Sequence, residues 1–149
     1  MKNDYYAETQ NEALKLENQL CFPLYAAARK VIGLYTPFLK PLGITYTQYI
    51  VFLVLWEEDG ITVGELGKKL SLDNGTLTPL LKKMEQEGFI KRLRSTADER
   101  VVIISLTTAG LALREQARDI PSCISQQIGL PPEDAAVLHR LLYRLLDEL

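Results

Sequence analysis

The two cysteines are the side chains best suited to covalent chemistry in this 149-residue chain. Cys21 lies two residues before Pro23, where the pattern predicts a helix boundary or kink. A thiol near the first amide N–H groups of a helix is stabilised as thiolate, which attacks peroxides to give a sulfenic acid and then a disulfide. Free cysteines are also common as inert small core residues. Both interpretations are open for Cys21 and for Cys123.

Other kinds of reactive site are not predicted. His139 is the single histidine, and no group of histidine, cysteine and carboxylate residues has the spacing of metal ligands. The sequence contains no glycine-rich phosphate loop and no Ser/His/Asp arrangement. We therefore expect no metal, no cofactor and no enzyme activity.

The bulk composition predicts a cytoplasmic globular protein. Apolar residues make up 47% of the chain and charged residues 24%, which suffices for a packed core. The longest apolar runs, such as residues 49–56, are shorter than the ~18 residues of a membrane span. The N-terminal stretch is polar and acidic and lacks the apolar region of a signal peptide.

Residues 62–106 have the pattern of a winged helix-turn-helix. Thr62–Leu70 reads as a short helix with Thr62 as N-cap, and a tight turn leads to a second helix, Asp73–Glu87. Residues 89–94 and 101–106 read as two strands joined by a polar tip, which indicates a β-hairpin. The second helix has a regular buried stripe at Leu77, Leu80, Leu81 and Met84.

The opposite face of the second helix suits DNA. The major groove is about 12 Å wide and admits one helix. Gly75 is small enough to let the backbone approach the duplex, and the hydroxyl of Thr78 could reach a base or a phosphate. Lys82 and Lys83 could neutralise phosphates. A solvated helix pair beside a surface hairpin is the competing interpretation.

The distribution of charge favours DNA binding more than the net charge does. The chain carries a formal charge of −2, which alone argues weakly against nucleic acid. Arg94 and Arg100 flank the hairpin tip, from which an arginine can enter a minor groove. Residues 82–100 hold six basic residues (Lys82, Lys83, Lys91, Arg92, Arg94, Arg100) and four acidic ones (Glu85, Glu87, Asp98, Glu99).

Pro79 leaves the start of the second helix open. Thr78 could be the N-cap, with Pro79 in the first turn, where proline costs little. Alternatively, the helix starts at Asp73 and contains Pro79 as a kink.

The flanking segments predict a mainly α fold with one small β-wing. We expect a helical dimerisation region at residues 1–44 and 108–149, and a DNA-binding region at 45–107. The leucine-rich faces exceed what one small core needs, which predicts a homodimer. Helices are predicted at 8–20, 24–39, 47–58, 108–118 (ended by Pro121) and from Pro131 to the C-terminus.

The segment LDNGTLTPLLKKMEQEGFIKR, followed by DERVVIISLTTAG, resembles the MarR family. The resemblance implies that the helix runs continuously from Asp73 through Pro79, and that Asp98 and Arg100 shape the wing and contact DNA. Asn74 departs from the serine that is usual there. The DNA-binding positions so implied are Asp73, Asn74, Gly75, Thr76, Thr78, Pro79, Lys82, Lys83, Arg94, Asp98 and Arg100.

Two further stretches, LENQLCFPLYAAAR and GITYTQYIVFLVLWE, look like the organic hydroperoxide resistance regulators within that family. The resemblance implies that Cys21 is the redox sensor and that Tyr35 and Tyr46 of the partner subunit contact its sulfur. Tyr25 matches a further position near the thiol. Cys123 lies in the region of a resolving cysteine, and Pro23 replaces the usual aliphatic residue.

We therefore expect a repressor that binds a pseudo-palindromic double-stranded DNA operator when reduced. Oxidation of Cys21 by organic hydroperoxides, followed by reaction with Cys123 or a low-molecular-weight thiol, would release the DNA. A regulator released by a small aromatic ligand and a global thiol-based redox or virulence regulator are alternatives. A thiol peroxidase is a fourth, and it would leave the DNA-facing lysines unexplained.

Overall fold

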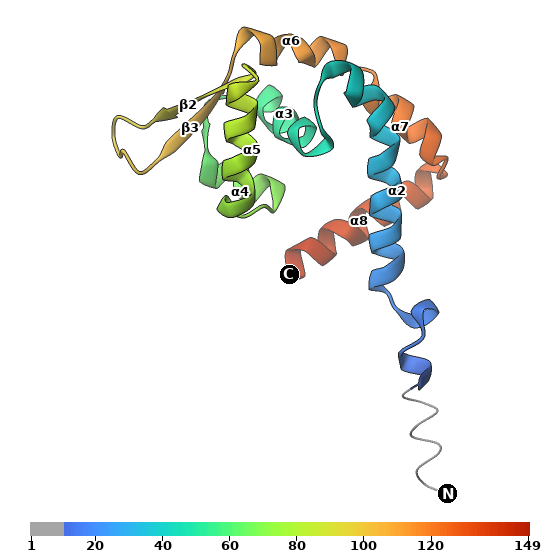
Figure 1. The fold of residues 1–149 in the computed structure, drawn as a ribbon. Helices are drawn as coiled ribbons and strands as arrows, with labels where there is room; N and C mark the ends of the chain where they lie inside the picture. The colour runs from blue at the N-terminus through green and yellow to red at the C-terminus, as the bar shows by residue number, and fades with distance from the viewer. Residues whose placement is uncertain (1–10) are drawn as a thin grey trace, which may run out of the picture. The chain divides into compact units, whose positions relative to one another are not determined.

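A computed structural model describes residues 11–149, and the chain is mainly helical with one small antiparallel sheet (Figure 1). This confirms the predicted fold class of a winged-helix protein. Contacts within the chain divide it into two compact units, residues 1–35 and residues 36–149, which are described separately.

The described part of the first unit contains a short 3₁₀-helix, η1 (Leu16–Asn18), and most of helix α2 (Cys21–Leu39). The helix predicted at 8–20 is wrong from residue 14 onward, and its first residues lie outside the described part. The side-chain amides of Asn18 and Gln19 donate to the carbonyls of Glu12 and Ala13, at 2.7 and 2.6 Å. Such side-chain bonds compete with helical backbone bonds. Pro23 lies in the first turn of α2, where proline is tolerated.

The core of the second unit forms around helix α3 (Tyr46–Glu57), which follows a 3₁₀-turn, η2 (Lys40–Leu42). Tyr49, Val51, Phe52 and Leu55 of α3 are buried. The ring of Phe52 stacks on Trp56 at a centroid distance of 5.3 Å and meets Phe89 edge-on at 5.6 Å. Helix α3 therefore anchors the two helices and the hairpin that follow it.

By length and composition, no single helix in the described residues qualifies as a membrane span. The bent pair 21–42 and 46–57 qualifies only when its two members are taken together.

The sheet has three strands in the order β1-β3-β2. Strands β2 (Ile90–Arg94) and β3 (Val102–Leu106) form the predicted hairpin, with Arg92 opposite Ile104. Strand β1 (Ile61–Thr62) pairs with β3 and was not predicted, because two residues are too few to show alternation.

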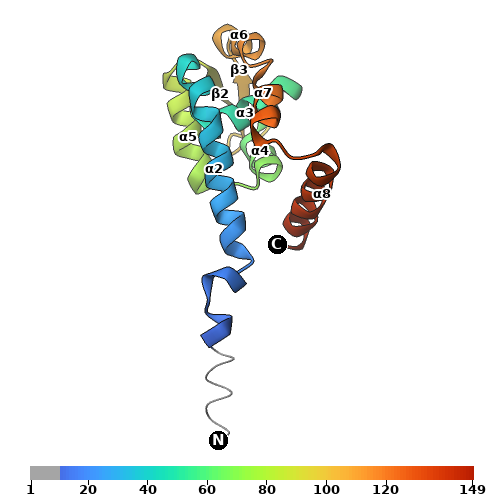
Figure 2. The same cartoon turned by 90° about the vertical axis from the view of Figure 1, so that its right-hand side faces the viewer.

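Three helices complete the second unit (Figures 1 and 2): α6 (Thr108–Gln116), α7 (Ile120–Ile128) and α8 (Pro132–Glu148). Thr107 caps α6, because its side chain accepts the amide of Gly110 at 3.2 Å. The sequence predicted no helix between Pro121 and Pro131, and this is wrong. Pro121 stands in the first turn of α7, where its fixed φ suits helix initiation.

Candidate nucleic-acid interface and thiol site

A tight turn connects helices α4 (Val63–Leu70) and α5 (Asn74–Gln86). Ser71 takes a left-handed φ of 53°, and the amide of Leu72 donates to the carbonyl of Gly67 at 3.0 Å. A Cβ on Gly67 would lie 2.8 Å from the Leu72 carbonyl oxygen, so this position requires glycine. The turn thereby fixes the angle between the two helices of the helix-turn-helix.

Helix α5 begins at Asn74 with Asp73 as its N-cap. The Asp73 carboxylate accepts the amide of Thr76 at 2.8 Å and its hydroxyl at 3.3 Å. The hydrogen bond that the Thr76 backbone amide donates holds the pKa of the Asp73 carboxyl below its ordinary value. The interpretation with Thr78 as N-cap is wrong. Pro79 lies inside the helix, where it removes the amide that would bond to the exposed Gly75 carbonyl.

Helix α5 buries one face and exposes the other. Leu77, Leu81 and Met84 are at most 1% exposed, which places the helix firmly against the core. The α5 residues of the predicted DNA-binding set are all exposed: Asn74, Gly75, Thr76, Thr78, Pro79, Lys82 and Lys83. We call this set of exposed residues the α5 face.

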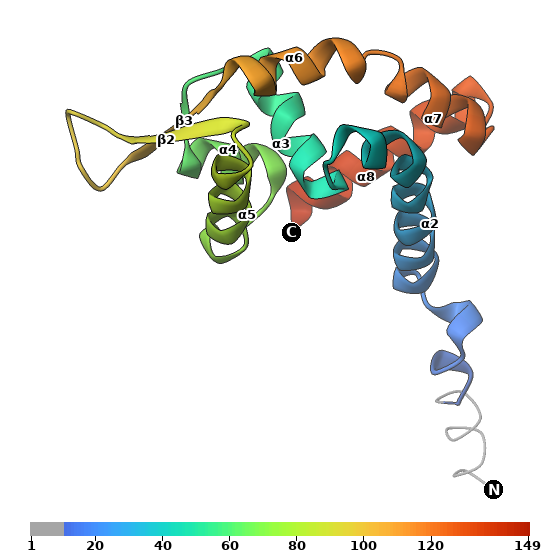
Figure 3. The same cartoon turned by 45° about the horizontal axis from the view of Figure 1, so that its top comes forward.

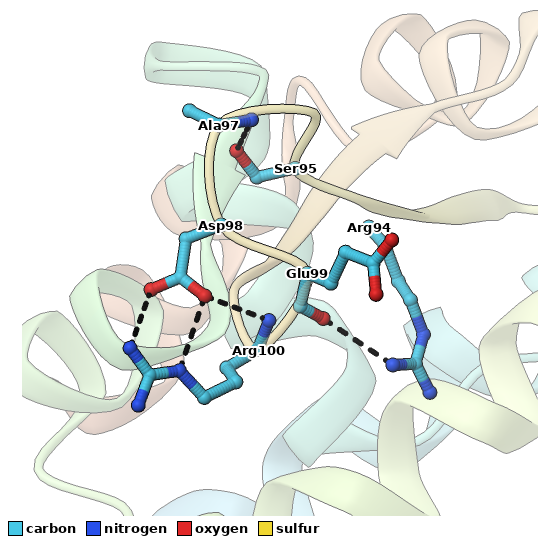
Figure 4. A network of polar contacts seen from close by, with 6 residues as sticks. All are labelled: Arg94, Ser95, Ala97, Asp98, Glu99 and Arg100. Atoms are coloured by element: carbon cyan, nitrogen blue, oxygen red, sulfur yellow. Dashed lines mark hydrogen bonds and ion pairs between the residues drawn. The ribbon is translucent and has the colours of Figure 1, made fainter.

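The wing extends away from α4 and α5 (Figure 3), and its tip is organised by Asp98 (Figure 4). The Asp98 carboxylate accepts the backbone amide of Arg100 at 3.0 Å and two guanidinium N–H groups at 3.2 and 3.3 Å. The hydrogen bonds from the Arg100 guanidinium lower the pKa of the Asp98 carboxyl most, and the hydrogen bond from the Arg100 backbone amide lowers it further. The Arg94 guanidinium donates to the carbonyl of Glu99 at 3.3 Å. The Arg100 side chain stays 91% exposed and can meet a ligand.

A carboxylate on α5 joins the wing to the recognition helix, and no pattern in the sequence indicates it. Glu85 accepts the backbone amide of Arg92 at 3.0 Å, and its other oxygen lies 3.6 Å from the Arg92 guanidinium. Strand β2 is an edge strand with outward amides to satisfy. Glu85 therefore helps to fix the angle between β2 and α5.

The predicted thiol site is divided between the two units. Cys21 is exposed as the first residue of α2, and its thiol is free. Tyr25, one turn later, is 59% exposed, and the Arg29 guanidinium lies 5.4 Å from its ring centre. Tyr35 is half-buried at the end of the first unit.

The remaining predicted thiol-site residues belong to the second unit. Tyr46 is the first residue of α3, and partial burial raises the pKa of its phenol. Cys123 lies inside α7 as a half-buried free thiol, on a regular helix rather than in a loop. In residues 11–149, no group of three or more histidine, cysteine or acidic side chains is placed to hold a metal ion.

Comparison with known proteins identifies the family. The sequence pattern described as transcriptional regulator SarA/Rot matches residues 33–116. Over 145 residues, the chain is 51% identical to the organic hydroperoxide resistance transcriptional regulator of Bacillus subtilis (strain 168), with 95% of this chain and 97% of that protein covered. The chain belongs to the SarA/Rot family of transcriptional regulators.

Solved structures of related regulators share the fold of this one and include DNA complexes. Overoxidised AbfR bound to DNA is 40% identical, with 94% of this chain and 99% of that chain covered and a TM-score of 0.77. AbfR has also been solved in a disulfide form, with 39% identity, 94% and 98% coverage and a TM-score of 0.64. A mutant of Escherichia coli MarR in complex with operator DNA is 31% identical, with 85% and 93% coverage and a TM-score of 0.78. These likenesses confirm the resemblance to MarR and to the hydroperoxide regulators, and this chain is a DNA-binding regulator.

Proposed function

We propose that this regulator is a cytoplasmic, redox-sensing repressor that releases its operator when an organic hydroperoxide oxidises Cys21. The single observation that carries the proposal is the free, exposed Cys21 thiol at the first turn of α2 in a chain 51% identical to an organic hydroperoxide resistance regulator. A thiol at such a position is accessible to a small oxidant. Tyr25 lies one helical turn away, and Tyr35 and Tyr46 are proposed to reach the sulfur from a partner subunit.

The chemistry requires one hydroperoxide and one further thiol. The Cys21 thiolate attacks a peroxide oxygen, the O–O bond breaks, and an alcohol leaves after taking up a proton. The resulting sulfenic acid is attacked by a second thiolate, which forms a disulfide with loss of water. Cys123 or a low-molecular-weight thiol would supply that second sulfur.

The forms of AbfR indicate which product should release DNA. AbfR is seen on DNA in an overoxidised form and has separately been solved with a disulfide. By analogy, overoxidation of Cys21 alone would leave this protein on its operator, so release would need a different product, the disulfide. We therefore propose that the disulfide or mixed-disulfide state is the one that leaves the operator.

A homodimer is part of the proposal. Helix α8 carries an apolar stripe that the single chain leaves largely open, with Leu141 50% and Leu146 53% exposed. Burial of such a stripe against a second copy would be strongly favourable. Two-fold symmetry would then present two α5 faces about one DNA turn apart to a pseudo-palindromic operator. Residues 1–44 and 108–149 are proposed as the dimerisation region and 45–107 as the DNA-binding region.

The test uses a duplex selected from a random pool by the reduced protein. We expect one equivalent of cumene hydroperoxide, with a small thiol present, to release this duplex in a gel shift. Cys21→Ser should bind the duplex and retain it after peroxide. Release of DNA from Cys21→Ser by peroxide would contradict the proposal, and release from reduced protein by an aromatic acid would favour a ligand-controlled regulator.

Cys123→Ser is the matched thiol control. Intact mass under non-reducing conditions distinguishes an intersubunit disulfide, which this variant lacks, from a mixed disulfide, which it keeps. We propose that the protein consumes peroxide only stoichiometrically, so that turnover of excess peroxide would show an enzyme instead.

A further inference from the structure

One polar side chain is buried in the DNA-binding unit without belonging to any site described above. Gln48, in the first turn of α3, is 1% exposed, and it is the one polar or charged residue among the buried residues of the described chain. Burial of an amide is costly unless its hydrogen bonds are satisfied. Its position therefore calls for a structural partner on each side of the amide.

Both ends of the Gln48 side chain have a partner. Its Oε1 accepts the backbone amide of Thr45 at 2.9 Å, which closes the capping box that starts α3. Its Nε2 donates to Oε2 of Glu87 at 2.6 Å, across 39 residues of sequence. A charged acceptor at this distance makes a strong hydrogen bond.

Glu87 is the C-cap residue of the recognition helix α5. Its amide donates to the Lys83 carbonyl at 2.9 Å, and its side chain is only 31% exposed. The Lys83 ammonium lies 3.9 Å from its other carboxylate oxygen, on the same helix. One carboxylate thus joins the last turn of α5, the α5 face and the first turn of α3.

We propose that Gln48 is a positioning residue for DNA binding, which fixes the recognition helix by holding Glu87. The hydrophobic contacts of Leu77, Leu81 and Met84 hold α5 against the core, but hydrophobic attraction has no preferred direction. The directional hydrogen bond between Gln48 and Glu87 adds a geometric constraint at the C-terminal end of α5. Tyr46 lies on the same capped turn, so a movement of this turn would be passed to α5 through Gln48. The inference rests on DNA binding by the reduced protein and not on the thiol switch.

The test exchanges the amide of Gln48 and the carboxylate of Glu87, first one at a time and then together. Q48E places a second carboxylate 2.6 Å from that of Glu87, and the repulsion should displace α5. We expect Q48E to bind the selected duplex roughly tenfold more weakly under reducing conditions. E87Q keeps a neutral hydrogen bond and should lose about twofold to threefold. The double variant Q48E/E87Q restores a charge-assisted bond with donor and acceptor reversed, and should bind within about twofold of the unchanged protein.

A control variant and a folding check accompany the exchange. Gln126→Glu makes the same chemical change at an exposed position of α7, inside the proposed dimerisation region. Size-exclusion chromatography first checks that its oligomeric state equals that of the unchanged protein, and its DNA affinity should then stay unchanged within about twofold. Trp56, the single tryptophan, reports folding by its fluorescence. Rescue separates positioning from general damage, because a merely disrupted core would not recover in the double variant.

Three results would overturn the proposal: normal DNA affinity in Q48E, no recovery in the double variant, or equal loss in Gln126→Glu. If Q48E does not fold, the double variant is compared with E87Q instead. The proposal is then overturned if the double variant binds the duplex more weakly than E87Q does. These measurements use only reduced protein and no peroxide, so failure here is distinct from failure of the redox proposal.

Discussion

Two regions of the molecule differ in how far a single chain determines their geometry. One is the α5 face together with the wing, and the other is the stretch around Cys21. Each element of the proposed DNA-binding surface is held by hydrogen bonds within the chain: Asp73 caps α5, Asp98 orients Arg100, and Glu85 joins α5 to β2. In the thiol stretch, Cys21 and Tyr25 are exposed, and the other predicted contacts lie in a different unit or farther along α2. The proposed DNA-reading surface therefore has its geometry set within one chain, whereas the proposed sensor calls for a second copy.

The largest expected effect comes from breaking the packing behind the wing. A Cβ on Gly110 would overlap the Phe89 carbonyl oxygen, and this backbone cannot move away without distorting β2. Gly110→Ala should lower the free energy of unfolding by about 1–3 kcal/mol and weaken DNA binding. Thermal unfolding followed by Trp56 fluorescence measures this, since the Trp56 indole donates to the Gly110 carbonyl at 3.0 Å.

Gly64→Ala is the control for that change. Only the Thr62 hydroxyl lies within reach of a Cβ there, at 3.9 Å. Alanine should therefore stabilise α4 by about 0.4–1 kcal/mol. Equal stability of Gly110→Ala and Gly64→Ala would show that the close approach at Gly110 relaxes freely.

The next largest effect is on DNA affinity without loss of stability. Asp98→Ala removes the acceptor of three hydrogen bonds from Arg100, whose exposed side chain then loses its direction. We expect affinity for the selected duplex to fall roughly tenfold, with the unfolding midpoint unchanged because the tip is outside the core. Fluorescence anisotropy with labelled duplex provides the measurement.

Glu99→Ala separates geometry from charge at the wing tip. It removes one acid next to Asp98, but Arg94 contacts the backbone carbonyl of Glu99 and not its side chain. Its DNA affinity should stay the same or rise slightly. A loss of affinity equal to that of Asp98→Ala would mean that the orientation of Arg100 is not what matters.

Local patterns predicted most of the DNA-binding region, because its caps and turns depend on neighbouring residues. The Thr62 side chain caps a helix within three residues of itself, so its role was predicted from the local pattern. Local propensity did not predict Asp73 as the cap of α5, because Thr78 before Pro79 offered a competing start. The continuous α5 across Pro79 came only from the family resemblance. Packing of Leu77 and Leu81 overrides the local penalty of the proline.

Contacts between residues far apart along the chain could not be predicted from the sequence. The bond between Gln48 and Glu87 spans 39 residues, and nothing in either segment marks the other as its partner. The helix around Cys123 was missed for a local reason, the ambiguous meaning of one proline. Pro121 was read as a helix breaker, although proline both ends and begins helices, and only the fold decides which.

The smallest expected effect tests whether the two regions act separately. Lys82 is exposed on the α5 face, and a lysine that neutralises one phosphate contributes about one unit to the slope of log K against log salt. Lys82→Ala should weaken binding about threefold on any duplex and reduce that slope by about one. Its peroxide response, the ratio of reduced to oxidised affinity, should equal that of the unchanged protein. Lys40→Ala, at an exposed lysine of η2, is the control and should leave the slope unchanged. A changed peroxide ratio in Lys82→Ala would mean that oxidation acts on the phosphate contacts themselves, and that the thiol region and the α5 face cannot be treated as separate devices.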